Sequence, residues 1–445
     1  MTRAGAKASG VFVAVFLALL ASQARAQEVA VQAGYVGLPV KGSAGGDGGI
    51  SLGQGGRLHA GVGAEGGYDS NIFYQPNGAL SSAILRVLPY LDLTNEPYSQ
   101  NGRSVVSGLF YDLQANLVYR HLFSDDSRID ASNIRDTFSP SVTGLVDFSS
   151  AQQLGVTVSD GFSRTEEAPY IPGNSEIIRN SNLAAAQLHW APGGGRIQGV
   201  LRYSNRLDLF EGDYHLDRNM DNEGMLDVSW RWFPKTALFV NFQQGFIRYL
   251  DSTQSNRDSK PLRAKVGLRG LITEKLSAGV SVGYSNGFYR DGTNPQGFGT
   301  VSASADVTWR PTVLTSVAFG YQHDFENSII SHYYNVDSLR LALRHAVENR
   351  LIVSAFGQYE NRRYDSAARL DVTMPLLNVG PSRTDNGFSA GLAADYYVKY
   401  WAYAGIGYNL VTNSSNAVFV DPTTGQSVSA DYVKQQVFVR IGLTY

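Results

Sequence analysis

The stretch VTWRPTVLTSVAFGYQHDF, residues 307–325, contains two runs of alternating apolar and polar residues separated by a proline. Alternation with a period of two is typical of a β-strand that has one face in an apolar environment and the other in water. The proline belongs to a Trp-x-Pro motif at 309–311, and the same motif recurs at 190–192 and 232–234, each time between two alternating runs. The pattern predicts a repeating architecture in which a strand ends near a tryptophan and the next strand returns directly.

Segments that alternate in this way follow one another across residues 58–445, and each is about ten residues long, as in strands that cross an outer membrane. In the last segment, YVKQQVFVRIGLTY, Val439 and Ile441 share one face, whereas Lys434 and Arg440 share the other. The residues expected on the apolar face include Leu201, Leu226, Val301 and Ile441. Alternation alone is also compatible with a soluble β-sandwich, so further observations are needed to choose between the two.

The connections between the predicted strands alternate in length. The short turns FPKT and TEK are followed by the longer segments DSTQSNRDSK and YRDGTNPQGFG, and the connection at residues 367–386 is longer still. Transmembrane barrels combine short periplasmic turns with longer outer loops. The connection lengths therefore favour a barrel.

The tryptophans gather where strands run into short turns, which places them at one rim. An indole has an apolar body and one hydrogen-bond donor, so it settles at a bilayer interface. We expect a periplasmic aromatic girdle made of Trp190, Trp230, Trp232, Trp309, Trp401 and Tyr445. The terminal aromatic residue also resembles the C-terminal signal by which outer-membrane proteins are recognised for insertion.

These observations predict an all-β fold, a single closed antiparallel transmembrane β-barrel of about eighteen strands. Sixteen strands is the alternative, because the segments between residues 142 and 159 alternate weakly. Barrels of roughly this size leave an aqueous channel rather than a filled core.

The N-terminal region has a different composition. Residues 1–26 carry basic residues, the apolar run VFVAVFLALL and an Ala-x-Ala site, which together predict a secretory signal peptide that is removed. Residues 27–56 are Gly-rich and predict a flexible periplasmic segment, and residues 57–445 are assigned to the outer-membrane barrel. The chain has no cysteine, so it has neither disulfides nor thiolate metal sites.

Composition and motifs argue against several functions. A net charge of −2 with mixed signs gives no general attraction to nucleic acid. The seven histidines follow no spacing typical of a nucleophile or a metal site. His323 and Asp324 are adjacent, but neighbouring strand residues point to opposite faces. We therefore expect no enzyme activity, no cofactor and no metal.

The face opposite the lipid is rich in charge. Its acidic residues include Glu65, Asp227, Asp395 and Glu360. The basic side chains that we predict to guide a solute are Arg86, Arg202, Arg206, Arg231, Arg263, Lys265, Arg269, Arg340, Arg344 and Arg440. Arginine suits carboxylate or phosphate groups in bidentate contact. The alternative is that these residues pair with the acidic ones and simply keep the wall hydrated.

The segment GGYDSNIFY, residues 66–74, followed by AILRVLPYLDL, residues 83–93, resembles the opening hairpin of an outer-membrane β-barrel group. The group is often encoded in exopolysaccharide biosynthesis loci of Gram-negative bacteria and is called putative beta-barrel porin type 2. The resemblance implies a periplasmic N-terminus, a single barrel and a role in moving polysaccharide to the cell surface.

Two functions remain. One is an outer-membrane channel that exports exopolysaccharide, supplied by a periplasmic or inner-membrane export component; the other is a general or solute-selective porin. A porin usually carries a constricting loop, and the candidate segments are residues 164–180, 207–219 and 367–386. An unobstructed pore of this width would leak small solutes, so we expect a loop or a partner to gate it.

Overall fold

The computed structural model describes residues 49–52, 56–95, 109–148, 153–167, 177–193, 195–251, 253, 257–289, 299–328, 331–348, 350–365, 383–420 and 427–445. The predicted signal peptide and most of the predicted Gly-rich segment lie outside these residues. Residues 168–176 and 367–382, which belong to two of the predicted constricting segments, also lie outside them.

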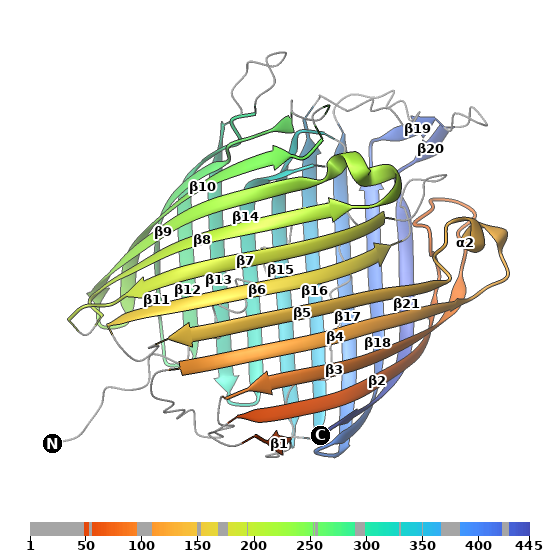
Figure 1. The fold of residues 1–445 in the computed structure, drawn as a ribbon, viewed down its shortest axis with the longest axis horizontal. Helices are drawn as coiled ribbons and strands as arrows, with labels where there is room; N and C mark the ends of the chain where they lie inside the picture. The colour runs from red at the N-terminus through yellow and green to blue at the C-terminus, as the bar shows by residue number, and fades with distance from the viewer. Residues whose placement is uncertain are drawn as a thin grey trace.

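The structure is a closed antiparallel β-barrel of eighteen strands, as predicted (Figure 1). The strands of its first half are β2 (Arg57–Asp69), β3 (Ser82–Thr94), β4 (Leu109–Phe123), β5 (Asp136–Phe148), β6 (Leu154–Glu167), β7 (Ile177–Trp190), β8 (Ile197–Phe210), β9 (Asn219–Phe233) and β10 (Thr236–Tyr249). Those of its second half are β11 (Leu262–Leu271), β12 (Leu276–Asn286), β13 (Gly299–Thr312), β14 (Thr315–Asn327), β15 (Tyr333–Val347), β16 (Leu351–Tyr364), β17 (Thr384–Lys399), β18 (Ala402–Ser415) and β21 (Tyr432–Thr444). Each strand pairs with the next along the chain, and β21 pairs with β2 to close the ring.

Few elements lie outside the ring. The helix α2 (Ser127–Ala131) and the 3₁₀ helix η1 (Gly212–Asp217) lie in connections, and β19 (Val418–Val420) forms a small hairpin with β20 (Ser427–Ser429). The short strand β1 (Ile50–Ser51) pairs with the start of β2. The predicted Gly-rich segment therefore includes two residues that extend the sheet, because their backbone groups find partners on β2. No helix in the described part of the chain is long and apolar enough to cross a membrane.

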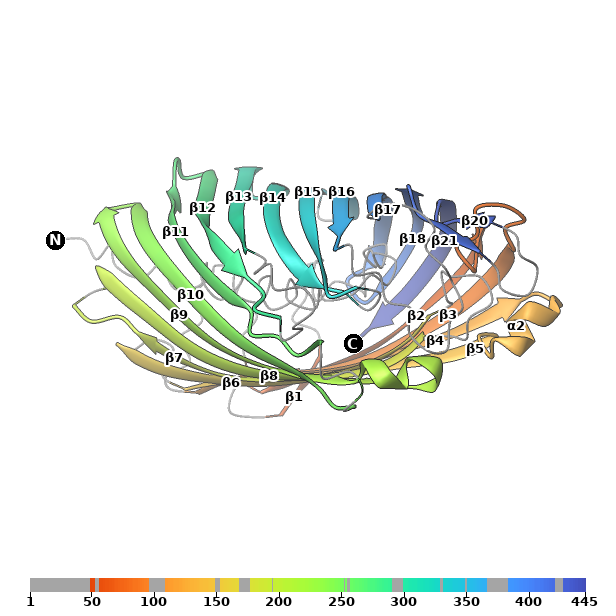
Figure 2. The ribbon, with the colours of Figure 1, turned by 90° about the horizontal axis from the view of Figure 1, so that it is seen from above.

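The two faces of the wall differ as the alternation predicted. Leu201, Leu226 and Phe242 are register partners on β8, β9 and β10 and point outward, with 56 %, 46 % and 44 % of their surfaces exposed. Val301 and Ile441 are each 60 % exposed on the same outer face. The inward positions of the same strands carry mostly polar and charged residues. Figure 2 shows that β6–β9 and β12–β17 face each other across the interior. An apolar outer surface around a polar interior is the arrangement of a membrane barrel.

The connections at the two ends of the barrel differ in length. One end, the short-turn end, has the connections 234–235, 272–275, 313–314, 348–350 and 400–401, whereas the connections at the other end, the long-loop end, include α2, η1 and the β19–β20 hairpin (Figure 1). The connection 95–108 is an exception, because it is long and lies at the short-turn end. By analogy with bacterial barrels, the short-turn end is assigned to the periplasm.

Two aromatic belts bound the outer face. Trp190, Trp230, Trp232, Trp309, Trp401 and Tyr445 are all at least 41 % exposed at the short-turn end. Near the long-loop end, outward tyrosines pair with polar residues of the neighbouring strand, as in Tyr203 with Asn222 (2.7 Å) and Tyr359 with Asn386 (2.8 Å). Along β9, Asn222 and Trp230 are about 27 Å apart at ~3.4 Å per residue. With the strand tilted by about 40°, this gives an apolar band of about 21 Å, close to that of an outer membrane.

Candidate functional site

The inner wall of the barrel holds the candidate functional residues. Residues that are register partners on neighbouring strands have their side chains on the same face of the sheet. Each inward position can therefore be followed around the ring. All ten basic residues predicted to guide a solute lie on the inward face: Arg86, Arg202, Arg206, Arg231, Arg263, Lys265, Arg269, Arg340, Arg344 and Arg440. They differ, however, in what they contact.

Charged residues of alternating sign cross the seam where the ring closes. Arg86 on β3 lies 3.6 Å from Glu65 on β2, and Glu65 is the register partner of Arg440 on β21. Arg440 donates to the carboxylate of Asp395 on β17, with 2.7 Å between Nε and Oδ1. These side chains hold the first and last strands together, and Arg86 and Arg440 therefore act as parts of the wall.

A glycine makes the last of these contacts possible. Gly405 on β18 is the register partner of both Arg440 and Asp395, and therefore lies between them. A Cβ atom at Gly405 would lie 2.2 Å from the Oδ1 atom of Asp395. Only glycine leaves the space through which an arginine and an aspartate can meet across an intervening strand.

A second seam contact lies nearer the long-loop end. The Nζ atom of Lys434 on β21 lies 2.9 Å from Asp69 on β2, and the two side chains are only 8 % and 4 % exposed. Lys434 also lies over the ring of Tyr74, 4.0 Å from its centroid, and donates to the carbonyl oxygen of Ile72. The connection between β2 and β3 therefore packs against the inner wall at the seam.

Carboxylates also hold three of the basic residues of β11. Asp324 on β14 contacts both Arg263 (3.3 Å) and Lys265 (2.8 Å), and Asp227 on β9 contacts Arg269 (2.7 Å). The first two pairs reach across intervening strands inside the barrel. For these residues the structure favours the hydrated-wall interpretation over a free binding group.

Arg202, Arg206 and Arg340 have neighbours of several kinds. Arg202 is 4 % exposed and faces Gln187 and Met225 across the strands. Arg206 is the register partner of Asp221, and Arg340 donates to the hydroxyl of Ser338 at 3.3 Å.

Arg231 and Arg344 lie at the short-turn end, and no described carboxylate forms an ion pair with either of them. Arg310 on β13, which is not among the predicted residues, is a third such arginine and is exposed on the inward face. The alternation contained the signal, because Arg310 follows the outward Trp309 directly. In the described part of the wall, these three arginines form no ion pair with a carboxylate.

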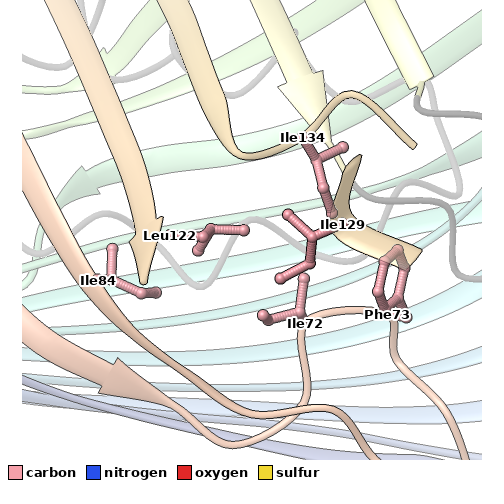
Figure 3. Packing of buried hydrophobic residues seen from close by; sticks show 6 residues of the cluster. All are labelled: Ile72, Phe73, Ile84, Leu122, Ile129 and Ile134. Carbon is pink, nitrogen blue, oxygen red and sulfur yellow. The ribbon is translucent and has the colours of Figure 1, made fainter. Parts of the chain in front are cut away.

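Connections at the long-loop end cover the upper part of the wall. Ile84 and Leu122 point inward from β3 and β4 and pack against Ile72, Phe73, Ile129 and Ile134 of the connections (Figure 3). Asp126 caps the N-terminus of the helix α2, where its side chain accepts a hydrogen bond from the backbone N–H of Arg128. Contacts with Arg128 lower the pKa of Asp126 to about 2. A second connection also packs on the wall, because Tyr214 of η1 contacts the inward residues Ile177 and Phe210.

His323 and its sequence neighbour Asp324 lie on opposite faces of β14 and have different partners. His323 points outward and lies 2.7 Å from Asp337, whereas Asp324 points inward to Arg263 and Lys265. Among the described residues, no group of three or more His, Asp or Glu side chains could hold a metal ion.

The wall and its two belts define a class of protein, the outer-membrane β-barrel channel. Residues 203–380 match the family model described as putative beta-barrel porin 2, which confirms the resemblance to that family. The match covers a different part of the chain from the hairpin at residues 66–93 on which the resemblance was based. No curated protein matches the chain.

Three solved outer-membrane proteins are similar to this chain over most of its length. The siderophore receptor PirA from Pseudomonas aeruginosa is 9 % identical, with 87 % of this chain and 80 % of that chain covered and a TM-score of 0.41. The alcaligin receptor FauA from Bordetella pertussis is 13 % identical, with 87 % and 76 % covered and a TM-score of 0.37. OpdK from Pseudomonas aeruginosa, solved with vanillate, is 9 % identical, with 87 % and 99 % covered and a TM-score of 0.44.

Proposed function

We propose that this outer-membrane channel exports exopolysaccharide to the cell surface. The supporting observation is the difference between the two ends of its polar interior. At the short-turn end, Arg310 and Arg344 are exposed on the inner wall, whereas at the long-loop end connections pack over the wall. A polar interior with exposed arginines at the short-turn end and packed connections at the long-loop end suits a hydrophilic polymer that loads from the periplasm.

Several features support a polymer rather than a freely diffusing solute. A ring of eighteen strands is wide enough for an aqueous channel, and covering loops would limit the leak of small solutes. The family resemblance adds the link to polysaccharide loci. A periplasmic or inner-membrane export component would deliver the polymer to the short-turn end.

A general or solute-selective porin is the alternative, and it is favoured by the description of the matching family model. A deletion strain separates the two functions. Under our proposal it loses surface polysaccharide, measured as extracellular carbohydrate per cell, while uptake of small nutrients stays normal. Complementation with the wild-type gene restores the polysaccharide. Normal polysaccharide together with impaired uptake of a small nutrient would establish the porin instead.

The inward arginines provide a finer test in the complemented strain. Replacing Arg231 and Arg344 with Gln should lower export, because both face the interior without a described carboxylate partner. Replacing Arg248 and Arg363, which are exposed outside the lumen near the long-loop end, is the matched control and should leave export unchanged. Both variants should assemble normally in the outer membrane.

A further inference from the structure

Four inward arginines occupy equivalent places on alternate strands at the short-turn end. Arg231, Arg269, Arg310 and Arg344 lie on β9, β11, β13 and β15, two or three residues before each strand ends at Phe233, Leu271, Thr312 and Val347. Register partners on the strands between them place Arg231, Arg269 and Arg344 on the inner face. Arg310 has no register partner of its own and is assigned to the inner face because it follows the outward Trp309 in the strand. We call this set the arginine arc.

The spacing of the arc follows from the sheet. Neighbouring strands lie about 4.8 Å apart, so successive arginines are about 10 Å apart and the whole arc spans about 29 Å. The strands between them carry small inward residues near this level, Ala237, Ser277 and Ser316. These small side chains do not cover the guanidinium groups of Arg231 and Arg344, whereas the guanidinium of Arg269 lies over the ring of Phe239 and pairs with Asp227.

The arc carries more positive than negative charge. Asp227 pairs with Arg269, and Asp306 faces inward from β13, but no described carboxylate forms an ion pair with Arg231, Arg310 or Arg344. The nearby turns contain Glu274 and Glu348, together with the basic residues Lys235, Lys275 and Arg350. The short-turn side of β9–β15 therefore has an excess of cations.

The wall formed by β3, β4 and β5 carries negative charges near the short-turn end. Asp92, Asp112 and Asp147 face inward on β3, β4 and β5. An anion that enters the short-turn end is therefore drawn toward the arc and away from these carboxylates.

We propose that the arginine arc is a binding site for a linear polyanion, a polymer that carries carboxylate or phosphate groups at intervals. Neighbouring guanidinium groups are about 10 Å apart, so a small monovalent anion contacts one of them, whereas an extended polymer contacts several at once. Arginine matches both kinds of acid group through paired hydrogen bonds. The proposal rests on the proposed function, and it identifies the exported polysaccharide as an acidic one.

An acidic segment of a partner protein is the competing occupant. The four arginines point into the lumen from within the strands rather than outward from the turns, so a polymer inside the channel reaches them more readily than a protein docked on the rim. A charge-matched variant tests this distinction, because Lys235, Lys275 and Arg350 lie in the turns at the same end.

The experiment measures binding of fluorescein-labelled polygalacturonate to the purified full chain in non-ionic detergent, by fluorescence anisotropy. Wild-type protein should bind it in 0.1 M salt and much more weakly in 1 M salt, because the screening length falls from about 10 Å to about 3 Å. The variant R231Q/R310Q/R344Q should bind about tenfold more weakly. The control K235Q/K275Q/R350Q should change binding by less than about twofold, since exposed turn charges contribute little.

Three results would contradict the proposal that the arginine arc binds a polyanion. The first is equal affinity of the wild-type protein for labelled dextran and for polygalacturonate, and the second is an equal loss of affinity in the two triple variants. The third is tight binding of polyglutamate without binding of polygalacturonate. Heat-modified mobility on gels verifies that each variant is a folded barrel. This binding experiment and the deletion strain test different proposals. If the deletion strain loses surface polysaccharide but the protein does not bind polygalacturonate, export is supported and the polyanion site is refuted. If the protein binds polygalacturonate but the deletion strain keeps its surface polysaccharide, the polyanion site is supported and export is refuted.

Discussion

The guanidinium group of Arg257 donates a hydrogen bond to the carbonyl oxygen of Ser328, 71 residues farther along the chain. Arg257 lies in the connection between β10 and β11, is 2 % exposed and also contacts the carboxylate of Asp217 in η1. Its guanidinium lies over the ring of Tyr249, 4.3 Å from the centroid. One buried arginine thus ties together three connections at the long-loop end.

Replacement of Arg257 should loosen this end of the channel. Each charge-assisted hydrogen bond contributes about 1.5–3 kcal/mol, so Arg257→Ala should release the three connections from one another. We expect the rate of sucrose entry in liposome-swelling assays to rise severalfold. Arg248→Ala is the control, because Arg248 is an exposed residue at the end of β10. Equal swelling rates for wild type and Arg257→Ala would show that Arg257 does not restrain the channel.

Two adjacent residues of β6 test which face meets lipid. Val158 is 46 % exposed and points outward, whereas Thr157 points inward opposite Asp147. Val158→Arg should destabilise the barrel by about 2–4 kcal/mol, as an arginine does near the bilayer midplane, and Thr157→Arg should cost much less. Urea unfolding in lipid vesicles measures both. A larger loss of stability for Thr157→Arg than for Val158→Arg would mean that the two faces are assigned the wrong way round. Leu226→Arg on β9 should behave like Val158→Arg.

The pair Asp69–Lys434 should stabilise the seam of the barrel. Asp69→Asn keeps the shape of the side chain but leaves the buried Lys434 without its counter-charge, and breaking such a pair costs about 3–5 kcal/mol. We expect this loss in urea unfolding followed by tryptophan fluorescence. The double replacement Asp69→Leu with Lys434→Met removes both charges and should recover most of the stability. If Asp69→Asn unfolds at the wild-type urea concentration, the pair contributes nothing to closure.

Gly405 should resist substitution for a steric reason. A Cβ atom there would lie 2.2 Å from Oδ1 of Asp395, so Gly405→Ala must separate Asp395 from Arg440. The buried Arg440 then loses its partner, and we expect the midpoint of urea unfolding to fall. Gly66 on β2 has open space around it, and Gly66→Ala is therefore the matched control with little change in the midpoint. Equal midpoints for the two variants would contradict this role of Gly405.

The sequence alone determined which residues face lipid and which face the lumen. Residues such as Leu226 and Arg231 could be assigned because a strand places successive side chains on opposite faces, and this period of two is visible in the sequence without knowledge of any partner strand. The same reasoning gave the number of strands and the rim that carries Trp309. Arg310 could be assigned to the inner face in the same way, because it follows Trp309 directly, although it is not among the predicted site residues.

Only the tertiary structure decided which charges are satisfied and which remain available. Asp69 and Gln436 are 367 residues apart and meet because the ring closes, and Arg440 reaches Asp395 because a glycine on the strand between them leaves space. Arg257 lies in a connection, where no period marks the direction of a side chain. Pairing depends on ring closure, strand stagger and loop packing, which are properties of three-dimensional neighbours. The alternation that fixed each face therefore could not separate paired arginines such as Arg440 from Arg231 and Arg344, which form no ion pair with a described carboxylate.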